Sequence, residues 1–220
     1  MIGTVLVMLI AVVALVVALF WAGPGRSDLS NLDLVPTAAA PGSWPTTAGQ
    51  AAAPDLRGWQ NSRTAQMAYG VAQAKARQWQ ADATLLMVTG TADAGDSARP
   101  SAISTWGYLY YSPAARSAVA ISVVENRAAL VTQGVPAGPL APLDASGWRI
   151  DSPAAVEKLL AAGGAEFIGQ EESATLFMTL TTNNESGRIE WFLSLINNQS
   201  GRSFTVRLDA STGEILEVGA

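Results

Sequence analysis

Carboxylates are the residues of this sequence whose types and spacing come closest to a catalytic pair. The nearest acidic cluster is formed by Glu171 and Glu172, with Glu185 and Glu190 in neighbouring strand and loop segments. Paired carboxylates can hydrolyse glycosidic bonds or bind calcium. No Asp-x-Asp-x-Asp loop supports calcium binding, however, and charges at strand ends are usually solvated. We keep a carboxylate-dependent hydrolase as an alternative, which requires Glu171, Glu172 or Glu190 to converge in a cleft.

Other residue types that support enzyme chemistry are absent or poorly placed. The 220-residue chain has no histidine and no cysteine, which excludes Ser-His-Asp and Cys-His catalysis, thiolate or imidazole zinc sites, and disulfides. A Ser-Lys pair needs a lysine held near a serine, whereas Lys75 and Lys158 fall on predicted exposed helix faces. We therefore predict that the protein is not an enzyme and has no catalytic residues, no metal site and no cofactor.

Basic residues are few and scattered along the chain. There are 13 Lys and Arg residues against 18 Asp and Glu residues, which gives a formal net charge of −5. A nucleic-acid-binding surface needs clustered Lys and Arg to neutralise phosphates. No such cluster occurs, so we predict that nucleic acid is not a partner.

Three aromatic residues, Trp106, Tyr108 and Tyr110, share one face of a predicted strand because side chains alternate along a strand. If this face is exposed, it is a candidate partner-binding surface for a peptide, a glycan or another domain. Core packing under the preceding helix or against a second module explains the same pattern. A second alternating set is predicted to be core: Trp191, Leu193, Leu195, Phe204, Val206 and Leu208.

A turn motif near the C-terminus has a clear physical basis. In the sequence Asp209-Ala-Ser-Thr212-Gly213-Glu, the Asp209 carboxylate can accept backbone N–H groups across the turn, and Gly213 can adopt the positive φ that closes it. Together with the helix opening Asp151-Ser152-Pro153, this stretch resembles the PepSY domain over residues 148–218, with a degraded copy over 63–131. The resemblance implies a helix paired with an antiparallel meander. It also implies an extracytoplasmic, non-catalytic module that binds peptides or restrains peptidases.

The remaining pattern predicts an α+β fold in which a helix followed by a meander occurs twice. A helix over 63–80 places on one stripe the residues Met67, Ala68, Val71, Ala72, Ala76 and Trp79. Ser152 and Pro153 begin a second helix as its cap and first residue, and Gly163-Gly164 ends it. Strands are predicted at 83–88, 103–111, 116–124, 128–131, 165–169, 174–181, 188–196, 203–209 and 214–218. The repeated order suggests an internal duplication.

The first 21 residues carry no charged side chain and are long enough to span a bilayer as a helix. A cleaved signal peptide is the alternative, but no Lys or Arg precedes the apolar run, and Phe20 occupies a position where cleavage after Ala22 needs a small residue. Arg26 alone does not determine the orientation. The predicted organisation is a transmembrane helix at 1–22, a Pro/Ala-rich linker at 23–56, a first module at 57–133 and a PepSY-like module at 148–220.

The apolar N-terminus predicts a single-pass, signal-anchored protein, and the PepSY resemblance implies a bacterial envelope protein whose C-terminal part is extracytoplasmic. Its expected partners are the membrane and a protein or peptide, which it would bind by strand addition at a sheet edge or through the aromatic face. The alternative outside the binding class is an accessory subunit of a larger membrane complex. In that case the small residues Ala11, Ala14, Ala18 and Ala22 would pack against other helices.

Overall fold

The computed structural model describes residues 64–94, 103–135, 141–171 and 173–219. The predicted transmembrane helix at 1–22 and the predicted linker at 23–56 lie outside these ranges. Within them, no helix combines the length and the apolar character that crossing a membrane requires.

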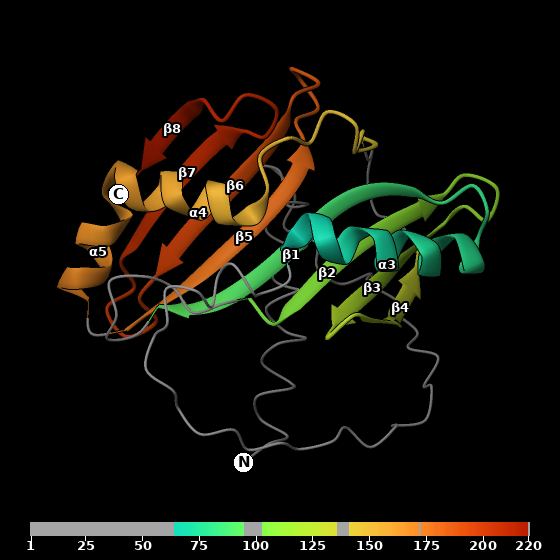
Figure 1. The fold of residues 1–220 in the computed structure, drawn as a ribbon, viewed down its shortest axis with the longest axis horizontal. Helices are drawn as coiled ribbons and strands as arrows, with labels where there is room; N and C mark the ends of the chain where they lie inside the picture. The colour runs from blue at the N-terminus through green and yellow to red at the C-terminus, as the bar shows by residue number, and fades with distance from the viewer. Residues whose placement is uncertain (1–63, 95–102, 136–140, 172, 220) are drawn as a thin grey trace, which may run out of the picture. The chain divides into compact units, whose positions relative to one another are not determined.

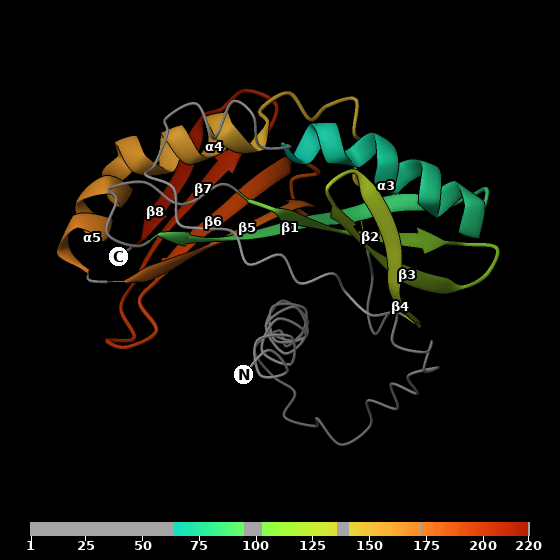
Figure 2. The same cartoon turned by 60° about the horizontal axis from the view of Figure 1, so that its bottom comes forward.

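The described residues form an α+β structure with one antiparallel sheet, as the sequence predicts (Figure 1). The strands are β1 (Thr84–Ala94), β2 (Thr105–Ser112), β3 (Ser117–Val124), β4 (Arg127–Gly134), β5 (Ala174–Thr182), β6 (Ile189–Ile196), β7 (Ser203–Asp209) and β8 (Ile215–Gly219). The helical segments are α3 (Ala65–Trp79), α4 (Ser152–Leu159), the π-helical turn η2 (Leu160–Gly164) and α5 (Ala165–Gln170). All of them lie on one face of the sheet (Figure 2).

The sheet has two four-stranded halves in the order β4-β3-β2-β1-β5-β6-β7-β8. In each half a helical segment precedes four consecutive antiparallel strands. The halves join where β1 pairs antiparallel with β5, from Met87 opposite Thr181 to Ala94 opposite Ala174. The two meanders therefore share one continuous sheet, whose outermost strands are β4 and β8.

One predicted strand, at 165–169, is wrong, because this segment is helix α5. Gly163 has a φ of 124°, yet it does not end the helical run, which continues through η2 into α5. Phe167 and Ile168 are adjacent and both buried, with Phe167 stacked on Phe204. A strand would place two adjacent side chains on opposite faces, so this pair fits a helix packed on the sheet.

Helix α3 packs on the sheet through small side chains. Its buried residues are Ala65, Ala68, Ala72 and Ala76, whereas Met67 is 62% exposed, so the predicted stripe is rotated from the observed one. The first turn begins at Thr64, whose Oγ1 accepts the N–H of Met67 at 3.2 Å. Alanine on the packed face lets the helix axis approach the sheet closely, where large aromatic side chains fill the space.

In the second half, the predicted core residues of β6 and β7 are all buried beneath the helical segments. Residues that alternate with the core lie on the other face of the sheet, and on β1 these include the half-buried Met87, Thr89 and Thr91. The core therefore lies between the sheet and the helices.

Candidate functional site

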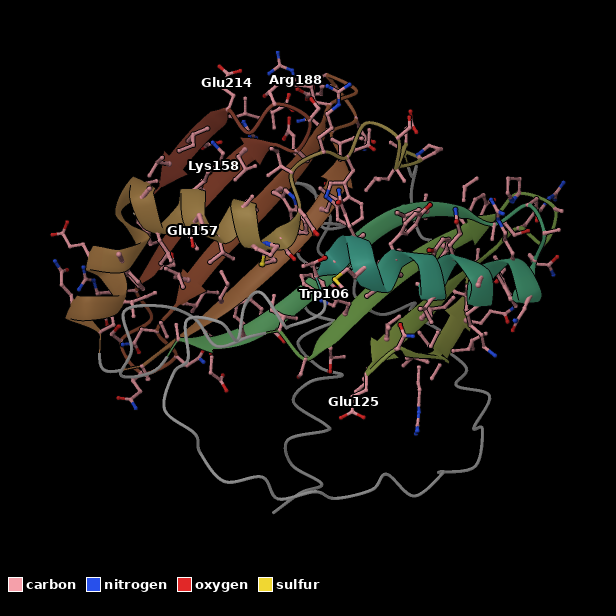
Figure 3. All side chains as sticks on the ribbon, viewed as in Figure 1. Trp106, Glu125, Glu157, Lys158, Arg188 and Glu214 are labelled. Carbon is pink, nitrogen blue, oxygen red and sulfur yellow. The ribbon has the colours of Figure 1, made fainter. Side chains whose placement is uncertain are left out.

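The aromatic stripe of β2 is part of the core and is not an exposed binding face. Trp106, Tyr108 and Tyr110 are 2%, 1% and 1% exposed, because α3 covers this face of β2 (Figure 3). Gly90 on β1 makes room for the indole ring, since a Cβ there would lie 2.6 Å from Trp106 Cζ3. The partner-binding prediction for these three residues is therefore wrong, and the core-packing alternative holds.

The two tyrosines of this stripe have different hydrogen bonding. The hydroxyl of Tyr108 donates to the carbonyl of Ala65 at 2.6 Å. The hydroxyl of Tyr110 is buried and has no hydrogen-bond partner within the part of the chain that the structure describes. Burial raises the pKa of both phenols, because a phenolate there would lose its hydration.

The N-termini of α3 and α4 meet at Asp151 and Ser152. Asp151 Oδ1 accepts the N–H of Ser152 at 2.7 Å and the N–H of Gln66 at 3.1 Å, while Ser152 Oγ accepts the N–H of Ala65 at 3.0 Å. Asp151, rather than the predicted Ser152, is thus the cap of α4, and both residues satisfy the free N–H groups of α3. The carboxylate also lies where the positive ends of both helix dipoles converge.

Aromatic residues fill the space beneath this junction. The indole N–H groups of Trp148 and Trp191 both donate to the carbonyl of Ile150, each at 2.8 Å. The Trp148 ring lies edge-on to Trp191 and to Tyr69 of α3, with centroid separations of 5.9 and 6.2 Å. The junction therefore links the two halves through packing and satisfied hydrogen bonds, which is a structural role.

Three hairpins of the second half close with the same six-residue turn. Their sequences are Asn-Asn-Glu-Ser-Gly-Arg at 183–188, Asn-Asn-Gln-Ser-Gly-Arg at 197–202 and Asp-Ala-Ser-Thr-Gly-Glu at 209–214. In each turn the first N–H donates to the sixth carbonyl, and the glycine N–H donates to the first carbonyl, at 2.8–2.9 Å. Gly187, Gly201 and Gly213 have φ values of 69°, 73° and 77°.

The turn predicted at Asp209, Thr212 and Gly213 has the expected contacts. Asp209 Oδ1 accepts the N–H groups of Ser211 and Thr212 at 2.7 and 3.0 Å, and Thr212 Oγ1 accepts the N–H of Glu214 at 3.2 Å. The Ser211 hydroxyl also donates to Asp209 at 2.5 Å. This hydroxyl and the two N–H groups stabilise the carboxylate and lower the pKa of Asp209. These bonds are internal to the turn, so the motif shapes a hairpin.

The carboxylates proposed for a hydrolase do not converge. Glu171 accepts hydrogen bonds from the side chains of Asn197 and Ser200 and pairs with Arg202 at 2.6 Å, which ties α5 to the 197–202 turn. Glu190 lies at the opposite end of β6, roughly 20 Å away along the strand. Catalytic carboxylates of glycosidases lie within about 10 Å of each other. Glu171 and Glu190 therefore do not form the carboxylate pair that this alternative requires.

The other acidic and lysine candidates from the sequence have the following places in the structure. Glu172 lies outside the described ranges, and Glu185 is exposed on the 183–188 turn. Glu190 is buried and lies 3.6 Å from Nε of Arg207, whose Nη2 lies 3.2 Å from Glu217. Lys158 of α4 packs beside the 209–214 turn (Figure 3), where a Cβ on Gly213 would lie 2.7 Å from its Cε.

No group of three or more Asp or Glu residues that could hold a metal ion occurs among the residues that the structure describes. Lys75 of α3, which the sequence predicts to be exposed, is half-buried, and no hydrogen bond between it and a serine of the described ranges is seen.

The two edge strands carry exposed apolar side chains. Leu130 and Val131 of β4 are 42% and 58% exposed, and Val135 directly after β4 is 81% exposed. On β8, Ile215 and Val218 are 40% and 49% exposed. The outer backbone groups of an edge strand are unpaired within the sheet and can receive another strand.

The edge strand β4 is longer than the sequence pattern predicts. The short apolar run at 128–131 is the only local signal, because Arg127–Gly134 does not alternate between apolar and polar residues. Its register against β3 shifts between Ala120 and Ile121, so one face of the strand does not stay buried along its length. Exposure on both faces removes the two-residue period that reveals an ordinary strand.

Comparison with known proteins does not assign the chain to a family. No family model matches the sequence, and no curated protein matches it. Among solved structures, the chain is similar to a Clostridium difficile 630 protein described as a "putative lipoprotein", with 12% identity and a TM-score of 0.39. The match covers 69% of this chain and 91% of that chain.

Proposed function

We propose that this protein is a membrane-anchored, non-catalytic binding protein of the bacterial envelope that captures an extended segment of a protein partner along β4. The observation that carries the proposal is the eight-residue edge strand Arg127–Gly134, which is exposed along most of its length. An added strand would pair with its free backbone groups and cover Leu130 and Val131.

The composition of β4 supports this role because it lacks the usual protection of sheet edges. Proteins block edge pairing with lysine, proline or inward-pointing charges. The only charged residue of β4 is Arg127, at its start, and the strand contains no proline or lysine. A register shift at Val131, where Ala120 pairs with Thr132 and Ile121 pairs with Leu130, is a feature of β4 that would hinder pairing. The other edge strand, β8, has five residues and carries the acidic Glu217, so the two edges differ in length and charge.

Sequence features support the location and the partner class. The uncharged residues 1–21 favour a single-pass anchor, and the resemblance to PepSY domains favours the extracytoplasmic side for the folded part. The resemblance of the Asp209 turn and the Asp151 helix start to PepSY domains favours a peptide or a peptidase as the partner. Confinement near the membrane would raise the effective concentration of a partner within reach of the linker.

Site-specific photo-cross-linking of the full-length protein in its native membranes tests the proposal. A photoreactive amino acid at position 131 should give a covalent adduct with a protein partner, because the side chain of residue 131 would lie beside side chains of the added strand. The matched control places the same group at position 67, since Met67 is equally exposed but lies on α3. No adduct at position 131, or equal adducts at both positions, would contradict the proposal.

A further inference from the structure

Exposed large apolar side chains of the described residues gather at the two edges of the sheet. Six such residues are exposed: Met67, Leu130, Val131, Val135, Ile215 and Val218. All except Met67 lie on β4, directly after β4, or on β8. Apolar side chains concentrated on strands with free backbone groups indicate surfaces that are covered in the functional state.

The two halves that end in these edges differ in charge. In the described residues of 64–135, which lead to β4, there are four Lys and Arg residues and three Asp and Glu residues. In the described residues of 141–219, which lead to β8, there are five Lys and Arg residues and ten Asp and Glu residues. The edges follow the same trend: β4 begins with Arg127, and β8 carries Glu217 and follows Glu214.

We infer that the occupant of the β4 edge is the β8 edge of a second copy of this chain. The inference rests on the proposed edge binding at β4 and names its partner. Joining β4 to β8 extends the sheet from one copy into the next and brings a slightly basic half against an acidic half. The exposed Leu130 and Val131 would be covered together with Ile215 and Val218.

Charge favours this pairing over pairing of identical edges. Contact between two β8 edges would place the acidic halves of both copies together, and contact between two β4 edges would gain no opposite charge. Pairing of unlike edges leaves one free β4 and one free β8 on every pair, so association continues into open chains or closes into a ring. The area buried by one pair of short strands is small, so the contact should be weak in dilute solution.

Sedimentation velocity of the full-length protein in detergent over a range of concentrations tests the inference. One variant blocks β4 with Leu130→Lys and Val131→Lys, and another blocks β8 with Ile215→Lys and Val218→Lys. The control variant is Met67→Lys, which adds the same charge at an exposed apolar position away from the edges. Thermal unfolding of each variant checks that the fold is retained, as expected for substitutions at exposed positions.

The wild type and the Met67→Lys control should associate with increasing concentration. Each blocked variant alone should remain monomeric over the concentrations at which the wild type associates, which corresponds to a Kd for self-association at least about tenfold higher. An equimolar mixture of the two blocked variants should form a one-to-one dimer and nothing larger, because each supplies the intact edge that the other lacks.

Self-association of either blocked variant alone would overturn the inference, as would a wild type that stays monomeric throughout. A mixture of the two variants that does not dimerise would also overturn it. If the wild type is monomeric while position 131 cross-links to a different protein, this inference fails and the proposed function stands. If position 131 gives no adduct at all, both fail.

Discussion

Helices α3 and α4 cover the same face of the sheet but meet it with side chains of opposite size. α3 buries four alanines, and the space below it is filled by Trp106, Tyr108 and Tyr110 of β2. α4 buries Val156 and Leu159 in addition to Ala155. The space between helix and sheet is thus filled by strand side chains in the first half and partly by helix side chains in the second. Two helices in equivalent places should therefore tolerate opposite kinds of substitution.

The largest effect is expected for Leu159→Ala in the second half. Leu159 is fully buried, so truncation removes apolar contacts and leaves a cavity, at a cost of about 2–5 kcal/mol in the free energy of unfolding. Urea denaturation measures this loss. The matched control is Leu160→Ala at the half-buried neighbouring position, which should cost less. Equal losses of stability at both positions would show that the buried side chain of Leu159 does not fill the core more than its half-buried neighbour does.

The opposite substitution should destabilise the first half. Ala72→Leu adds volume at a fully buried position of α3, and overpacking of this kind costs about 1–3 kcal/mol. Ala74→Leu on the exposed side of the same helix should change the free energy of unfolding by less than about 0.5 kcal/mol. A neutral Ala72→Leu would mean that α3 does not depend on small residues for its position.

The paired tyrosines sharpen the description of the first half. Tyr108→Phe removes the hydrogen bond to the carbonyl of Ala65 and should cost about 1 kcal/mol. Tyr110→Phe removes a buried hydroxyl that has no partner among the described residues, so it should be neutral or stabilising. Thermal or urea unfolding of the two variants under identical conditions gives the comparison. If Tyr110→Phe destabilised the protein more than Tyr108→Phe, the assignment of the unsatisfied hydroxyl to Tyr110 would be contradicted.

Local chemistry explains why some of this structure is predictable from the sequence. The turn at Asp209, Thr212 and Gly213 depends on bonds within six residues, so residue types alone reveal it. The double capping by Asp151 and Ser152 joins residues 85 and 87 positions apart, which no local pattern can show.

The errors in the prediction have the same origin. Helix α5 and the rotated face of α3 are both decided by what packs against them. The burial of Trp106 depends on where α3 lies, and a strand pattern gives the same alternation for a buried face and for an exposed one.

The smallest effect concerns the three repeated turns, of which only the one at 209–214 begins with a titratable residue. The folded-state pKa of Asp209 is lowered, so its contribution to stability is present above the unfolded pKa of about 4 and is lost as pH falls through the folded pKa. Asp209→Asn keeps the acceptor oxygen but cannot titrate. The wild type should exceed this variant in stability by up to about 1 kcal/mol near neutral pH, and the difference should shrink below about pH 4. A difference that is constant from pH 7 to 3 would contradict this account.

Hydrogen exchange of the β4 backbone amides tests the central claim, that this edge pairs with another strand, most directly. Some backbone amides of Arg127–Gly134 should exchange rapidly when the full-length protein is in dilute detergent. The same amides should be protected from exchange in native membranes, because an added strand accepts their hydrogen bonds. The Leu130→Lys, Val131→Lys variant should lose this protection, while the Met67→Lys control should keep it. Equal exchange of the β4 amides in membranes and in dilute detergent would contradict the account.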